Sequence, residues 1–398
     1  MVGLVGALAF VVGAGVAWLV ARRTRVPYPI VLVAWGLAMR EVAERFAAFA
    51  PPVRLSPHLL LDLLLPPLLF EGAHALRAAD VRRSAPLIAL LAGPGVVLGG
   101  ALAMVLTWAA LHLVGAREDA WLAALLFAAV TSATDPIAVL AVLRSARAAP
   151  SLRVVLDAES LLNDAMAVVV VGIVVSVAGG ESPRWGSVLV GAAWHTIAGL
   201  AIGAAIGWVA STLASFVSRA LGAYAVLPTA LSMCAAYGAH VAATRLGASS
   251  LFAVIAAGFV WGQRYGAPEA AVKRFWRTGA TAINALTFLL VGLELDPARL
   301  GRRPLMVLFA WGALLLARAA FVGVFTHVTG EASRHPGGRR VLVLGGIRGA
   351  LAIVLAQRLP PSTAREVVID LTLGVVCLTL AQGLVIAYGR RRGAATSR

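Results

Sequence analysis

Apolar runs recur from one end of the chain to the other, separated by short polar or basic segments. Most are long enough for a helix that crosses a hydrocarbon core of ~30 Å. We therefore predict an all-α polytopic membrane protein of about 13 transmembrane helices. The predicted spans cover roughly residues 2–20, 28–39, 57–74, 86–114, 120–143, 155–178, 187–213, 222–244, 249–263, 278–295, 304–328, 339–358 and 367–388.

Composition supports this class. The chain of 398 residues is 60% hydrophobic and 13% charged, far fewer charges than soluble proteins carry. No polar linker long enough to separate domains interrupts the spans, so residues 1–398 form one predicted transporter unit, with a short basic tail at 389–398. The net charge of +16 does not indicate nucleic-acid binding, because the arginines lie in short clusters between apolar runs.

The distribution of basic residues predicts the orientation. With the 21–27 loop in the cytoplasm, 21 of the 34 Lys and Arg residues lie inside and 11 outside, while Arg318 and Arg348 lie within spans. This asymmetry places the N-terminus outside and the C-terminus in the cytoplasm. Because 33 of the 34 are Arg, we expect a GC-rich bacterial source, and hence the inner membrane.

Span five contains a polar site in the motif TSATDPIAV, which includes Thr134, Asp135 and Pro136. Proline removes a backbone donor and disfavours helix at the residue before it, so we expect a helix break. Backbone groups freed within a membrane must face protein, water or an ion. The alternative is a simple proline kink beside a buried, protonated Asp135.

Span six begins with the polar sequence ESLLND. At ~100° per residue, Glu159, Ser160, Asn163 and Asp164 share one face of the helix, and Ala and Val occupy the other. Ionisable groups within a membrane are costly and commonly functional. A helix-packing patch is the alternative.

Two arginines lie within later spans. In span twelve, GGIRGA places Arg348 between glycines that permit a second helix break, and a structural ion pair is its alternative role. Arg318 in span eleven needs a partner, for which Glu294, Glu71 and helix-end carbonyls are the candidates. We interpret Arg318 as a structural residue first, with a secondary role in transport as the alternative.

The predicted topology brings three of these groups to one depth. Asp135 lies nine residues before Arg144, Asp164 eleven after Arg153, and Arg348 eight after Arg340. At the rise of an α-helix, all three lie ~12–17 Å from the cytoplasmic side. Residues distant in sequence can therefore share one site near the midplane.

The spans also indicate an inverted repeat. Broken spans five and twelve are seven apart and enter from opposite sides, and spans three and ten show the similar motifs LPPLLFEGA and TFLLVGLEL. This predicts a first repeat at 1–178, a connecting helix at 187–213 and a second repeat at 222–388. Crossed broken helices at the binding site are typical of such transporters.

Together, TDPIAV, ESLLNDAMAV, LPPLLFEG, FLLVGLEL and GGIRGALAI resemble the first cation:proton antiporter family, the sodium/proton exchangers, and its prokaryotic members in particular. The resemblance covers nearly the whole chain. It implies a homodimer in the lipid bilayer, in which a core of six helices moves against a dimerisation part. It implies no cofactor besides the transported ions, and no nucleotide or nucleic-acid partner.

The resemblance also implies residue roles. Asp135, Asp164, Ser160 and Thr134 would surround the Na⁺ (or Li⁺) ion. Glu159 would contact Arg348, with Asn163 helping to hold this pair. Asn163 before Asp164 resembles the electroneutral, one-for-one branch of the family.

The expected mechanism follows from the carboxylate. Asp164 can hold a proton or a hard cation but not both, so exchange is coupled if only the loaded carboxylate crosses. Potassium/proton exchange by the same fold is the alternative, and a cation channel is a more remote one. No protease, zinc or nucleotide-binding motif appears in the sequence, so we predict that the protein is not an enzyme.

Overall fold

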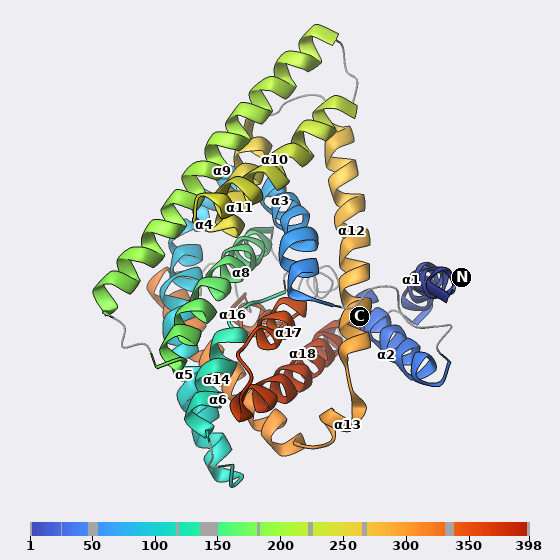
Figure 1. The fold of residues 1–398 in the computed structure, drawn as a ribbon, viewed down its shortest axis with the longest axis vertical. Coiled ribbons are helices and arrows are strands. Elements are labelled where there is room, and N and C mark those ends of the chain that lie inside the picture. Colours follow the sequence, from blue (N-terminus) through green and yellow to red (C-terminus); the bar gives the residue numbers. More distant parts are fainter. Residues whose placement is uncertain are drawn as a thin grey trace.

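The computed structural model describes residues 2–24, 26–46, 55–116, 119–135, 150–180, 184–221, 226–264, 269–330 and 338–395. Within these ranges the chain is helical and contains no strand (Figure 1). The helices are α1 (Val2–Thr24), α2 (Tyr28–Arg45), η2 (Leu59–Leu64, π-helical), α3 (Leu65–Ala75), α4 (Ala78–Ala92), α5 (Pro94–Leu113), α6 (Ala120–Val130), α8 (Pro150–Ala178), α9 (Trp185–Leu221), α10 (Val226–Arg245), α11 (Ser250–Arg264), α12 (Glu269–Glu294), α13 (Pro297–Leu300), α14 (Pro304–Val328), α16 (Gly338–Leu344), α17 (Ala350–Gln357) and α18 (Thr363–Ala395).

The predicted fold class is confirmed, and about 13 spans are consistent with the helices found. Five helical segments of the described chain are long and apolar enough to cross a membrane by length and composition. They are Ala78–Leu113, Ser151–Ala178, Trp185–Ala220, Val226–Arg245 and Pro304–Val328. Part of predicted span five, from Pro136 onward, lies outside the described residues.

Predicted span four is divided between two helices. Gly93 separates α4 from α5 with φ −100° and ψ −95°, and Pro94 begins α5. Proline fits there because the first N–H of a helix has no intrahelical partner. The helical segment begins at Ala78, eight residues before the predicted start at 86.

Predicted span three begins with an unusual turn. The π-helical stretch η2 runs directly into α3, where Pro66 and Pro67 supply no backbone donors. In a regular helix, the N–H of residue 67 would bond the carbonyl of Leu63. That carbonyl instead accepts a hydrogen bond from the Tyr237 hydroxyl of α10, at 2.9 Å.

The helices form two bundles, defined by their contacts. The first bundle contains α1, α2, η2, α3, α9, α10, α11 and α12, and the second contains α4, α5, α6, α8, α14, α16, α17 and α18. Figure 1 shows α9, α10 and α11 together at one end and α6 and α14 towards the other. The bundles meet where α8 contacts α3 and α11, and where α12 contacts α17.

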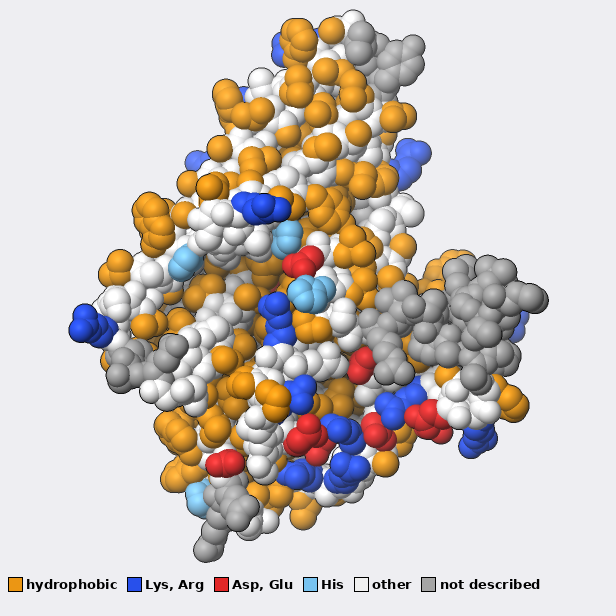
Figure 2. Space-filling model, in the orientation of Figure 1, with side chains coloured by type: hydrophobic (Ala, Val, Ile, Leu, Met, Phe, Trp, Pro, Cys, Tyr) orange, Lys and Arg blue, Asp and Glu red, His pale blue; other side chains and the backbone are white. Residues whose placement is uncertain are grey.

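The surface separates apolar from charged regions. Large apolar side chains of α9, such as Leu189, Val190 and Trp194, are exposed, as expected for helices that face lipid. Figure 2 shows that hydrophobic side chains cover much of the face over α9–α11, while acidic and basic side chains gather at its other end. Among the ion pairs of the described residues are Arg299–Glu366 at 3.1 Å and Arg303–Asp370 at 3.5 Å.

Candidate functional site

The site is built around two interrupted helices in the second bundle. Helix α6 ends at Val130, and residues 131–135 continue in a non-helical conformation. Residues 345–349 likewise separate α16 from α17. Both predicted breaks are therefore confirmed, at least up to Asp135 in the first case.

The two non-helical segments cross and are joined by their backbones. The N–H of Asp135 donates to the carbonyl of Ile347 at 2.8 Å. A Cβ atom added to Gly349 would overlap the Asp135 side chain. Glycine is needed at 349 because the two segments approach each other so closely. Its backbone angles do not require glycine, since φ is −130°.

Helix α8 presents its four predicted polar residues to this crossing. Glu159, Ser160, Asn163 and Asp164 are all buried, with 1%, 2%, 3% and 7% of their surfaces exposed. The Thr134 hydroxyl donates to Ser160 Oγ at 3.2 Å. The structure therefore brings together residues of spans five and six, as predicted.

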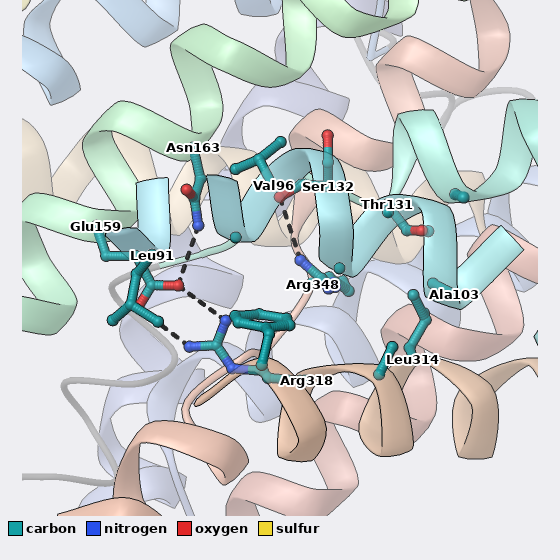
Figure 3. Close-up of a pocket in the computed structure, with 16 residues that line it drawn as sticks. Leu91, Val96, Ala103, Thr131, Ser132, Glu159, Asn163, Leu314, Arg318 and Arg348 are labelled. Atoms are coloured by element: carbon teal, nitrogen blue, oxygen red, sulfur yellow. Dashed lines mark hydrogen bonds and ion pairs between the residues drawn. The ribbon is translucent and has the colours of Figure 1, made fainter. Parts of the chain in front are cut away.

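Asn163 connects the two halves of the site. Its Nδ2 donates to Glu159 Oε1 at 3.1 Å and to Thr134 Oγ1 at 3.3 Å. Its Oδ1 is buried and accepts no hydrogen bond among the described residues. Figure 3 shows the bond from Asn163 to Glu159. One amide thus joins the Glu159 carboxylate to the Thr134–Ser160 pair.

Glu159 forms its ion pair with Arg318, whereas the resemblance implied a contact with Arg348. Arg318 Nη1 and Nη2 donate to the two Glu159 oxygens at 2.8 and 3.1 Å, a bidentate geometry (Figure 3). Arg318 Nε donates to the Leu342 carbonyl at 2.9 Å. Of the partners considered for Arg318, a helix-end carbonyl is found. In the part of the chain that the structure describes, its carboxylate partner is Glu159 and not Glu71 or Glu294.

Arg348 binds the end of the other broken helix. Its Nη1 donates to the carbonyls of Ala133 at 3.0 Å and Ser132 at 3.3 Å. These carbonyls follow the C-terminus of α6, where the helix dipole is negative. Since the guanidinium is largely buried, with 8% of the residue exposed, it compensates this partial charge where water is scarce.

Asp164 is a buried carboxylate that is incompletely hydrogen-bonded. Its Oδ1 is buried without a hydrogen-bond partner among the described residues. The Thr134 backbone amide lies beside the carboxyl, and the charges of Asp135 and Arg348 lie within electrostatic range. An incompletely paired carboxylate beside a helix break can accept a proton or a cation.

A small cavity of about 30 Å³ lies beside the crossing. Glu159, Asn163, Arg318 and Arg348 line its polar end. Helices α5 and α14 supply apolar walls, with Val96 and Leu314 among the lining residues (Figure 3). Asp164 is not among its lining residues. The cavity therefore reaches the residues that support the site, not Asp164.

Sequence reasoning missed two polar residues that contact the second break. Thr379 Oγ1 accepts from the Arg348 N–H at 3.3 Å, and Gln382 Nε2 donates to the Leu344 carbonyl at 2.9 Å. Both are uncharged residues in an apolar helix. Their spacing of three places them on one face, which is the only signal that could have found them.

Comparison with known proteins gives consistent results. The family described as sodium/hydrogen exchanger, transmembrane, matches residues 6–388. The low-affinity Na⁺/H⁺ antiporter NhaS1 of Synechocystis sp. is 31% identical over 92% of this chain and 69% of its own length. The Na⁺/H⁺ antiporter NhaP of Pseudomonas aeruginosa is 33% identical over 84% of this chain and 80% of its own.

A solved structure shares the fold. The sodium proton antiporter MjNhaP1 from Methanocaldococcus jannaschii superposes with a TM-score of 0.71, at 18% identity, over 96% of this chain and 95% of that chain. At this identity the likeness concerns the fold, and the fold it supports is the one that the motifs predicted.

Proposed function

This chain belongs to the sodium/hydrogen exchanger family, and we propose that it exchanges Na⁺ for H⁺ across the membrane. The protein is a transporter and not an enzyme. The names of the relatives favour Na⁺ over the K⁺ of the alternative hypothesis. The observation that carries the proposal is the buried Asp164 carboxylate, whose Oδ1 has no partner among the described residues, beside crossed broken helices.

We propose that Na⁺ binds between Asp164, Asp135, Ser160 and Thr134. Sodium is a hard cation that prefers oxygen ligands, which these side chains supply. The Thr134–Ser160 hydrogen bond and the Thr134 amide beside Asp164 support this assignment. Na⁺ is here a transported substrate, not a resident metal.

Glu159, Asn163, Arg318 and Arg348 act as supporting residues in this proposal. The charges of Glu159 and Arg318 neutralise each other. Asn163 is hydrogen-bonded to both Glu159 and Thr134, so the position of the ion pair fixes the position of Thr134. Arg348 holds the end of α6 near the ion. None of the four needs to touch Na⁺ directly.

Competition at Asp164 couples the two ions. A proton or a Na⁺ ion neutralises the carboxylate, and a neutral site crosses the membrane interior more readily than a charged one. One cation for one proton makes the exchange electroneutral. Movement of one bundle against the other would then expose the site alternately to each side.

Three further features belong to the proposal. The protein works as a homodimer in a bacterial inner membrane. Its N-terminus lies outside and its basic C-terminus in the cytoplasm, in accord with the distribution of Lys and Arg. Residues 1–178 and 222–388 form the two inverted repeats, and the two bundles support this because each contains three predicted spans of each repeat.

Exchange by purified protein in liposomes tests the function. With an internal pH dye and an imposed proton gradient, Na⁺ or Li⁺ should collapse the gradient in the wild type, and Asp164→Asn should respond no more than protein-free liposomes. Asp157→Asn is the matched control, because Asp157 lies two turns away on α8 and pairs with Arg153 at 3.8 Å. It should retain exchange.

The outcomes separate the hypotheses. A response to K⁺ alone would establish the alternative exchange. Coupled exchange that persists in Asp164→Asn would contradict the role of this carboxylate. Cation flux without proton movement would indicate a channel.

A further inference from the structure

The end of α16 leaves backbone carbonyls that no helical N–H can satisfy. The last carbonyls of any helix lack intrahelical partners, and within a membrane water cannot replace them. Arg318 Nε donates to the carbonyl of Leu342, and Gln382 Nε2 donates to that of Leu344, each at 2.9 Å. Side chains from two neighbouring helices therefore cap α16.

Trp311 fixes the orientation of the Gln382 amide. The indole N–H can only donate, and it donates to Gln382 Oε1 at 3.2 Å. The amide nitrogen must then face the Leu344 carbonyl. Gln382 thus joins α14 to the end of α16 with both ends of its amide in use.

Thr379 holds the opposite side of the break. Its hydroxyl donates to the Val376 carbonyl at 3.1 Å and accepts from the Arg348 N–H at 3.3 Å. The N–H of Arg348 lies two residues before α17, in the non-helical segment, where no intrahelical acceptor is available to it. Thr379 and Gln382 are three residues apart on α18, so one face of this helix contacts both ends of the 345–349 segment.

We propose that Thr379 and Gln382 are positioning residues for ion exchange, acting through the 345–349 segment. The carbonyl of Ile347 in this segment accepts a hydrogen bond from the Asp135 N–H. The Arg348 guanidinium donates to the carbonyls of Ser132 and Ala133. The position of the segment therefore sets the position of residues 131–135, which carry two proposed Na⁺ ligands. This inference rests on the proposed exchange function. It adds the residues that fix the position of the 345–349 segment relative to residues 131–135.

Neutral side chains suit this task. The groups at a helix break carry partial charges, which hydroxyl and amide groups satisfy without adding a net charge. A charged residue at 379 or 382 would change the field at Asp164, which already lies within range of Asp135 and Arg348. Thr and Gln fix the geometry and leave that field unchanged.

The experiment compares threonines on one helix. Thr379→Val removes the hydroxyl at nearly constant volume, and Thr379→Ser keeps it. Thr372→Val is the matched control, because Thr372 is buried on α18 two turns away and its hydroxyl has no partner among the described residues. Full-length variants are assayed in liposomes for apparent KM and Vmax with Na⁺, and their thermal stability is measured in detergent.

Leaving a buried N–H without an acceptor is unfavourable, so we expect Thr379→Val to raise the apparent KM for Na⁺ roughly tenfold. Vmax should change much less. Thr379→Ser should restore the wild-type KM, and Thr372→Val should stay within about twofold of it. Gln382→Met, which removes both bonds of the amide, should raise KM in the same way.

A wild-type KM in Thr379→Val, with an active wild-type protein, would overturn this inference alone. A loss of stability and Vmax without a change in KM, not rescued by Ser, would also overturn it, because it would show a merely structural role. If Thr379→Val does not fold, the apparent KM of Gln382→Met for Na⁺ tests the inference instead, and a wild-type KM in that variant would overturn it. An inactive but folded wild type would overturn the exchange proposal, and this inference with it.

Discussion

Two buried arginines near Glu159 have different tasks. Arg318 neutralises Glu159 through a bidentate pair, in which 5% of the Arg318 side chain and 1% of the Glu159 side chain are exposed. Arg348 contacts main-chain carbonyls at the end of α6 instead. Both guanidinium groups therefore have negative or partially negative partners, which buried charges require.

This difference between the two arginines predicts that substitutions of Glu159 and Arg318 have coupled effects on stability. Removing one partner of a buried pair costs ~3–5 kcal/mol, whereas replacing both by apolar residues is often neutral. We expect Glu159→Met to be strongly destabilising and the double variant Glu159→Met/Arg318→Met to recover most of the stability. Thermal unfolding in detergent measures both.

The corresponding set of single and double variants of Glu159 and Arg348 is the control for this coupling. Glu159→Met/Arg348→Met should show no comparable recovery, because no hydrogen bond joins these residues. Stronger coupling to Arg348 than to Arg318 would contradict the pairing seen in the structure.

The residues of the site were predictable from the sequence, but this pairing was not. Counting from the loops gives the depth of Asp135, Asp164 and Arg348, because a helix rises by a fixed distance per residue. Depth does not say which arginine faces Glu159. That depends on how α14 packs against α8 and α16, which is set by tertiary contacts.

At the scale of elements, glycines determine how closely helices approach. A Cβ atom at Gly199 of α9 would overlap the backbone of Ser249, the residue before α11. A Cβ atom at Gly203 or Gly207 would overlap the backbone of α11 at Ala253 or Ala257 respectively. The four-residue spacing is the same on both helices, so one stripe packs along the other. This glycine spacing therefore allows close packing of the two helices.

The middle of this stripe gives a prediction about stability. Gly203→Ala should lower the thermal stability, because its Cβ meets a rigid backbone carbonyl rather than a movable side chain. Gly191→Ala on the same helix is the control, since nothing lies within 4 Å of its added Cβ. Alanine favours helix over glycine by up to ~1 kcal/mol, so this variant should be neutral or slightly more stable.

Melting temperatures of the two purified variants check this prediction. Equal effects of both substitutions would show that helix propensity, and not the contact with α11, decides the outcome. A destabilised Gly203→Ala that retains its KM for Na⁺ would agree with a structural role for the stripe.

For the whole molecule, the sequence predicts the number and order of helices better than it predicts which helices belong to which bundle. Apolar runs and the breaks near Gly93, Thr134 and Gly346 follow from local rules about hydrophobicity, proline and glycine. The division into two bundles does not, because most exposed and buried faces in a membrane are equally apolar. It is the contacts of α8 with α3 and α11, and of α12 with α17, that place the boundary between the bundles.

This boundary predicts which cross-links stop transport. Gln357 Nε2 of α17 donates to Glu294 Oε2 of α12 at 3.2 Å, so this hydrogen bond joins the two bundles. Asp62 Oδ1 and His240 Nε2 lie 3.5 Å apart within the first bundle. If the bundles move as rigid bodies, linking the first pair should block exchange, and linking the second should not.

The test replaces each pair by cysteines in a protein whose Cys234 and Cys377 are changed to Ala. A short bifunctional thiol reagent with a reducible linker is added to liposomes, and Na⁺-driven proton movement is recorded before and after reduction. Exchange should fall to the background in the 294–357 variant and return on reduction, while the 62–240 variant stays active throughout. Full activity in a completely cross-linked 294–357 variant would mean that the boundary between α12 and α17 does not move during transport, and the moving part would then have to be sought within the second bundle, around the crossing itself.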